Sequence, residues 1–195
     1  MQSCVRSAVF SLLLSLQLGG QVKITRDGDR IIVDVQGKPF TAIYITGAET
    51  TKPYFHPVRA ATGTIVTRRY PMESLEGELR NEKHQRGLRF SHGDVNGFDF
   101  WDNEASYTTT NRGFIVLDRV LGLVGGDKTG SIDARFKWVD PKQKVLIEET
   151  RKMVIYSDCA SRKSYLRPEP ACRARWKSPV GCHGFRVTSR STDPR

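Results

Sequence analysis

The sequence predicts an all-β fold, an antiparallel β-sandwich, on three observations. From Gln21 onward, apolar and polar residues alternate with a period of two in several short stretches. Turn-forming residues separate these stretches at short intervals. No stretch sustains the 3.6-residue period of an amphipathic helix. Short alternating strands joined by frequent turns are typical of two antiparallel sheets packed face to face.

Three strands are expected at the start of the domain. Residues 22–25, 31–35 and 40–44 each place apolar side chains at alternate positions, so that one face of each strand is apolar. The triplets at 27–29 and 36–38 each have a central glycine, which favours a tight turn. The three strands therefore follow one another through two short turns.

Further strands are expected later in the chain. Residues 64–70 are rich in β-branched side chains and predict another strand. Apolar residues alternate again over 132–138, and after a turn at 140–142 a strand over 145–156 returns the chain. Residues 122–130 predict a glycine-rich loop. Because that loop lacks G-x-G-x-x-G and G-K-[ST], it does not indicate a phosphate-binding site.

The first twenty residues predict a signal peptide. Arg6 supplies a positive charge, residues 7–18 are mostly apolar, and Gly19 and Gly20 are small residues at the expected cleavage point. The stretch is shorter than the roughly 20 apolar residues that a membrane span needs, and no comparable run follows it. We therefore expect a secreted or periplasmic protein with no membrane span after the signal segment. A buried first helix and an uncleaved anchor are the alternatives.

The composition changes after Asp158, which divides the rest of the chain into a β-sandwich domain over 21–158 and a tail over 159–195. Apolar alternation stops there, and Arg, Ser and Pro become frequent. Residues 160–195 carry +7 of the formal net charge of +10. The tail is predicted to be irregular, either as a disordered basic segment or as a non-native reading frame. A nucleic-acid partner is not expected, because its binding would depend on this tail alone.

The chemistry, if the chain has any, is expected between residues 52 and 101. Three of the four histidines, His56, His84 and His92, lie there among Arg, Asp and Asn rather than in apolar runs. Imidazole titrates near neutral pH, so His84 or His92 suits a general acid or base. Asp94 lies two residues after His92 and would face the same side of an extended strand. His84, His92 and Asp94 are therefore the predicted catalytic residues.

Six further side chains are predicted to bind a substrate. Two arginines suit a carboxylate or another anion, while amide and carboxylate groups suit sugar hydroxyls and an indole ring offers an apolar platform. The predicted substrate-binding residues are His56, Arg59, Arg86, Asn96, Asp99 and Trp101. Three histidines could also form a metal site, but the sequence predicts no metal ligand and leaves the cofactor unknown.

Structural roles compete with these functional ones. Gly93-Asp94 and Asn96-Gly97 are ordinary turn dipeptides. Large aromatic residues such as Phe98 and Phe100 are more often core than platform. A histidine beside an aspartate is often only a hydrogen-bonded pair. The clustering of these residues, and no single one of them, favours a functional site.

Three segments carry a resemblance to a known family. They are Lys52-Pro53-Tyr54-Phe55-His56-Pro57, Val66-Thr67-Arg68-Arg69-Tyr70-Pro71-Met72 and Ser91-His92-Gly93-Asp94-Val95-Asn96-Gly97-Phe98-Asp99-Phe100-Trp101. Together they resemble the PmoA-like family, exported bacterial proteins named after a methane oxygenase or left as a domain of unknown function. The resemblance covers roughly residues 21–158. It implies a β-sandwich with a His-rich cleft, common in bacteria that degrade polysaccharides.

The sequence departs from that family in two places. Where the family shows Asp-His-Pro-His-His-Arg, this chain reads Asn81-Glu82-Lys83-His84-Gln85-Arg86, so only His84 and Arg86 match. The loss of two imidazoles and a carboxylate argues against a multi-histidine metal site. The resemblance also fades near Asp158, which favours a frame change or truncation there. A truncated sandwich is expected to be incomplete, with open strand edges.

Three functions compete on these observations. The first is an exported protein that binds or processes a carbohydrate. The second is a metal-dependent oxygenase, as the family label says. Membrane-embedded methane oxygenases span the membrane with several apolar helices, and no apolar run of that length follows Leu18 in this sequence. The third is a truncated remnant without catalytic activity. The sequence leaves open whether the chain is an enzyme and which substrate it takes.

Overall fold

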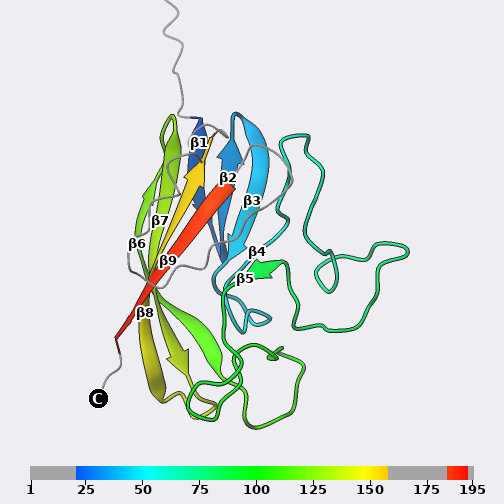
Figure 1. The fold of residues 1–195 in the computed structure, drawn as a ribbon, viewed down its shortest axis with the longest axis vertical. Coiled ribbons are helices and arrows are strands. Elements are labelled where there is room, and N and C mark those ends of the chain that lie inside the picture. The colour runs from blue at the N-terminus through cyan, green and yellow to red at the C-terminus, as the bar shows by residue number, and fades with distance from the viewer. Residues whose placement is uncertain (1–20, 158–183, 193–195) are drawn as a thin grey trace, which may run out of the picture.

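The structure, a computed structural model, describes residues 21–157 and the backbone of residues 184–192. The predicted signal segment and most of the predicted tail lie outside the described residues. The described residues form two antiparallel sheets (Figure 1), which confirms the predicted all-β sandwich. Nowhere in the described ranges is there a helix with the length and apolar character of a membrane span.

The first sheet follows the chain in simple order. Its strands are β1 (Val22–Asp27), β2 (Arg30–Val35), β3 (Lys38–Tyr44), β4 (Tyr54–Phe55) and β5 (Leu88–Arg89). The first three agree with the predicted strands, and Gly28 and Gly37 in the turns between them have φ of 55° and 72°. Positive φ is the conformation for which glycine was expected there. The apolar face of β2 is fully buried against the second sheet.

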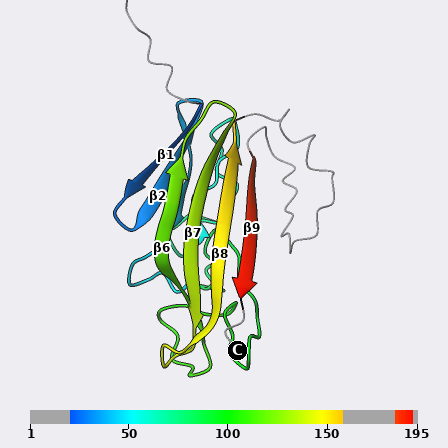
Figure 2. The same cartoon turned by 90° about the vertical axis from the view of Figure 1, so that its left-hand side faces the viewer.

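The second sheet contains the longest strands. They are β6 (Phe114–Val124), β7 (Thr129–Val139), β8 (Val145–Tyr156) and β9 (Gly184–Thr192), again in chain order. Figure 2 shows them side by side, with β9 next to β8 at one edge. β7 and β8 confirm the strands predicted over 132–138 and 145–156.

The strand predicted over 64–70 is wrong. Only an isolated bridge between Arg59 and Ile65 forms there, supported by a hydrogen bond from Val66 N to Val58 O of 2.9 Å. None of the residues 64–70 is buried. The β-branched composition was right for a strand, but no sheet face is available on which such side chains would pack.

The glycine-rich loop predicted over 122–130 is much shorter in the structure. β6 runs through Gly122 to Val124, and β7 begins at Thr129. Gly130 lies within β7. A side chain at this position would clash, because a Cβ would approach Val22 Cγ1 to 2.6 Å and Ile24 Cδ1 to 2.8 Å. That glycine marks a close contact between the two sheets rather than a turn.

The tail is not irregular throughout. β9 pairs with β8 along nine residue positions, from Tyr156 opposite Gly184 to Glu148 opposite Thr192. The edge of β8 that an incomplete sandwich would leave open is therefore paired. Residues 184–192 are too polar for their sequence to indicate a strand. Backbone pairing with the edge of β8, rather than burial of apolar side chains, holds them in the sheet.

The sandwich has two apolar cores. The larger lies between the sheets and joins β2 and β3 to the inner face of β8 through Met153 and Ile155. The smaller lies where β6, β7 and β8 extend past the first sheet, and there loop residues cover them (Figure 1). Its centre is Phe100, packed against Trp138 with ring centroids 4.9 Å apart.

A buried ion pair lies on the inner face of β8 between these cores. Glu149 and Arg151 are each 2% exposed and bond through Arg151 Nε to Oε1 at 2.7 Å and Nη2 to Oε2 at 2.8 Å. Trp138 Nε1 donates to Glu149 Oε2 at 2.8 Å. The guanidinium of Arg151 faces the rings of Phe90 and Phe136, at 5.3 and 4.7 Å from their centroids. Each charge is thus paired and its hydrogen bonds are satisfied.

Glu149→Gln is expected to lower the free energy of unfolding by about 3–5 kcal/mol, because it leaves the Arg151 charge buried without a counter-charge. Urea denaturation measures this difference. Glu148→Gln is the matched control, since Glu148 is exposed on the opposite face of the same strand. This substitution should change the free energy of unfolding by no more than about 0.5 kcal/mol. Equal effects of the two substitutions would contradict the role assigned to the pair.

Candidate functional site

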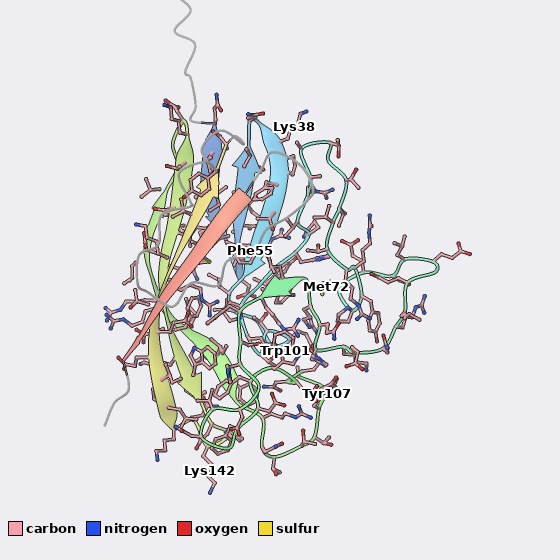
Figure 3. All side chains as sticks on the ribbon, viewed as in Figure 1. Lys38, Phe55, Met72, Trp101, Tyr107 and Lys142 are labelled. Carbon is pink, nitrogen blue, oxygen red and sulfur yellow. The ribbon has the colours of Figure 1, made fainter. Side chains whose placement is uncertain are left out.

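The candidate site lies in the long connection between β3 and β6. Residues 45–113 contain only the two-residue strands β4 and β5, so buried polar contacts rather than a sheet hold most of this segment. Figure 3 shows the side chains there, with Trp101 and Tyr107 in the loops below β5. Loops fixed on a rigid sandwich are where binding and catalytic residues concentrate.

One network ties the start of this segment to its end. All six residues of 51–56 are buried. Lys52 Nζ donates to Asn103 O at 2.5 Å, and Thr51 Oγ1 donates to the same oxygen at 3.1 Å. Asn103 Nδ2 in turn donates to Gly113 O at 2.5 Å. These bonds satisfy backbone oxygens that no strand pairs.

Arg86 is paired inside the protein. Its Nε and Nη2 reach both oxygens of the buried Glu104 carboxylate at 2.6–3.1 Å, and its guanidinium lies 5.9 Å from the centroid of the Tyr54 ring. Burial opposes the charge, but the bonds to Glu104 and Tyr54 outweigh it and raise the pKa of Arg86. The predicted anion-binding role of Arg86 is therefore filled by a carboxylate of the chain itself, which the sequence did not reveal.

His84 forms a pair with Asp102. Its Nδ1 lies 2.9 Å from Asp102 Oδ1, and Asp102 Oδ2 lies 2.7 Å from Arg112 Nη1. Tyr107 Oη is also 3.4 Å from Nδ1. A carboxylate only accepts, so Nδ1 carries the proton and donates to it, and in the neutral ring Nε2 is then the acceptor nitrogen. Burial lowers the pKa of His84, and Asp102 opposes that shift.

Trp101 and Arg89 lie beside this pair. Trp101 is 45% exposed, although large aromatic residues are usually core, and its neighbour Phe100 is 1% exposed. Arg89 Cζ lies 4.6 Å from the centroid of the Trp101 ring. Asp99 Oδ1 accepts from the backbone N of both Trp101 and Asp102, at 2.8 and 3.0 Å, and so fixes the platform and the carboxylate together.

Lys52 and Arg89 lie close enough for their positive charges to repel each other. Burial and, to a smaller extent, the positive charge of Arg89 lower the pKa of Lys52 to about 7, although the carboxylates of Glu104 and Asp102 oppose this shift. Burial likewise lowers the pKa of Arg89 to about 10, so its guanidinium stays protonated at neutral pH. Titratable groups perturbed in this way often mark functional sites.

His56 and Arg59 lie apart from this cluster in their contacts. His56 is 2% exposed, and both ring nitrogens are enclosed without a hydrogen-bond partner, Glu73 Oε1 being 3.4 Å from Nε2. Burial lowers the pKa of His56, although Glu73 opposes this shift. Arg59 Nη1 donates to Gly63 O at 3.3 Å within its own loop.

The segment around His92 is a turn. Asp94 Oδ1 accepts from Gly97 N at 2.9 Å, and Asn96 has a φ of 53°, as turn residues do. His92 is exposed, and its Nδ1 lies 3.0 Å from Asp94 O. Asp94 and Asn96 thus shape this turn, which is the structural role expected of turn dipeptides.

The structure brings some predicted residues together and not others. His84, Trp101 and Asp99 meet around Asp102, whereas no hydrogen bond or ion pair within the described ranges joins His56, His84 and His92 to one another. In the same ranges, no group of three or more His, Cys, Asp and Glu side chains is arranged to hold a metal ion.

Sequence reasoning missed five members of the cluster. They are Lys52, Arg89, Asp102, Glu104 and Arg112. Lys52 opens one of the quoted segments and Asp102 directly follows another, so proximity to those segments was the available signal. Nothing in the order of residues indicated which charge pairs with which.

Asp102→Asn is expected to lower the pKa of His84 further, because the carboxylate opposes the effect of burial. An NMR titration of the histidine ring signals measures this shift. Asp94→Asn is the control, since Asp94 bonds its own turn and should leave the His84 titration unchanged. A His84 pKa that is the same in Asp102→Asn and the unaltered chain would refute the pairing.

Lys52 is expected to make stability rise with pH. Its pKa is about 7 when folded against 10.5 for the free side chain, so between these values the unfolded chain binds the proton and the folded chain does not. The free energy of unfolding contributed by this group therefore increases from pH 7 toward 10.5, by at most about 1.4 kcal/mol per pH unit.

Urea unfolding of the unaltered chain and of Lys52→Met at several pH values tests this dependence. The difference in free energy between the two should move in favour of the unaltered chain as the pH rises. The exposed Lys38, the first residue of β3 in the first sheet, supplies the control substitution Lys38→Met. A difference for Lys52→Met that stays flat with pH would show that the amine is not held in a desolvated state.

Comparison with known proteins places the chain in a family. The model of a family of unknown function, DUF6807, matches residues 30–180, which extends beyond Asp158. No curated protein and no solved structure matches the chain significantly. The family description carries no PmoA name, so the PmoA-like assignment remains a resemblance. The chain belongs to this family of unknown function, DUF6807.

Proposed function

We propose that the chain is an exported protein, secreted or periplasmic, that binds or processes a carbohydrate at the loops around Trp101. The observation that carries this proposal is an exposed indole directly beside a histidine–aspartate pair. A sugar ring stacks its apolar face on an aromatic ring and offers its hydroxyls to polar groups at the rim. The resemblance to PmoA-like proteins of polysaccharide-degrading bacteria supports the same function.

In this proposal, some residues of the site bind the sugar and others transfer a proton. Trp101, which directly precedes Asp102 in the chain, would be the platform. His84 has its Nδ1 held by Asp102, so that Nε2 is free to take a proton from a hydroxyl or from water. Arg112 holds the second oxygen of Asp102 and so fixes the carboxylate that orients the imidazole. Roles for His92 and Asp94 in catalysis stay predictions.

Trp101→Ala is expected to weaken oligosaccharide binding about tenfold or more, because it removes the stacking surface. Thermal stabilisation by a panel of oligosaccharides identifies a ligand, and calorimetric titration then measures its affinity. Leu121→Ala is the matched control: Leu121 is 48% exposed against 45% for Trp101, but it lies on β6. A folded protein that no sugar stabilises would refute the proposal.

His84→Asn separates binding from processing. If the pair acts in catalysis, release of reducing sugar ends should fall while affinity for the oligosaccharide stays within about threefold, since truncation of a proton-transfer group removes rate rather than ground-state binding. The variants His92→Ala and Asp94→Ala test the other two predicted catalytic residues in the same assay. Unchanged turnover in His84→Asn would exclude it as the acid or base.

A further inference from the structure

Arg89 is a half-buried guanidinium without an acceptor among the described residues. Its Nε and Nη2 are enclosed and have no hydrogen-bond partner within the described residues, while Nη1 is not enclosed in this way. Enclosed donors without partners are uncommon in proteins, and each calls for an explanation. The contact of this guanidinium with the Trp101 ring orients it but accepts no hydrogen bond.

Neighbouring arginines of the same loops are paired. Arg86 has the buried carboxylate of Glu104 at 2.6 Å, and Arg112 has Asp102 at 2.7 Å. The carboxylates near Arg89 are therefore already bound to other cations. Arg89 differs from its neighbours in having no counter-charge of its own.

A second cation sharpens this imbalance. Lys52 is 4% exposed, its ammonium bonds only a backbone oxygen, and its charge and that of Arg89 repel each other. Arg89, together with Lys52 when its amine is protonated, has no unpaired carboxylate beside it in the described part of the chain, so the loop surface beside Trp101 has a positive potential. An anion arriving there would supply the missing counter-charge.

We infer that the carbohydrate bound at this site carries a carboxylate, and that Arg89 binds this carboxylate through its open Nη1 side while the sugar ring lies on Trp101. The inference rests on the proposed carbohydrate function and narrows its substrate to acidic saccharides. Arginine suits the role because its charge is permanent and its guanidinium can stack on an aromatic ring while Nη1 donates to one carboxylate oxygen.

Calorimetric titration with three probes tests the inference. The first is trigalacturonic acid, the second is its methyl ester, which has the same sugar skeleton without charge, and the third is sodium acetate, which has the carboxylate without a sugar. The unaltered chain should bind the acid at least about tenfold more tightly than the ester, with an affinity that falls as salt rises. Arg89→Gln should bring the two trisaccharide affinities to the same value, and Arg89→Lys should keep part of the difference.

Arg119→Gln is the control, because Arg119 is 61% exposed on β6 and should leave both trisaccharide affinities unchanged. Arg89→Gln is also expected to keep or raise the melting temperature, since it removes a buried charge that nothing compensates. Acid and ester binding equally, or a preference that survives Arg89→Gln, would overturn the inference and leave the proposed function standing. Acetate binding as tightly as the acid would overturn the inference too. Binding of neither trisaccharide would overturn both.

Discussion

The packing of the candidate-site loops on the second sheet depends on the buried bond between Glu149 and Arg151. Both side chains point inward from β8, at the place where the first sheet ends and loops begin to cover the second. Arg151 lies between Phe136 of β7 and Phe90, which directly follows β5. A charge in this position is tolerable only because a carboxylate and two aromatic faces surround it. The contact with Phe90 fixes the loops on the sheet, and the candidate site is built on those loops.

The site residues are positioned by their neighbours in the chain. Phe90 is packed into the smaller core while Arg89 lies under Trp101, and Phe100 is packed into the same core while Trp101 is exposed. At the end of β5 the backbone is extended and adjacent side chains point in opposite directions, so burial of Phe90 orients Arg89. Phe100 and Trp101 lie in a bend, which Asp99 Oδ1 fixes by accepting from the backbone N of Trp101. Gly113 allows this packing, because a Cβ there would come within 2.3 Å of the Phe100 ring. The core thus holds Arg89 and Trp101 in place without contacting their outer faces.

Periodicity predicted the parts of the fold in which each strand has one buried face. β2, β7 and β8 alternate cleanly and were predictable. β6 was not, because register shifts near Leu117 and Val120 break its alternation. β4 and β5 are too short to show a pattern. His84 and Trp101 were predictable as site residues by their type, but Asp102 was not, because its contact with His84 depends on loop geometry that no period records.

Charged side chains in the described part of this protein differ in whether another side chain of the chain pairs with them. Glu149 with Arg151, and Glu104 with Arg86, are complete pairs whose hydrogen bonds close within the chain, and folding alone accounts for them. Arg89 is only half-buried, but its Nε and Nη2 are enclosed and no carboxylate pairs with it among the described residues, so for stability alone a glutamine or a methionine would serve better at that position. A residue that costs folding free energy and has no internal partner is explained most simply by a partner that arrives from outside. That argument supports our proposal that a ligand binds at the loops around Trp101, and it does not depend on the presence of histidines.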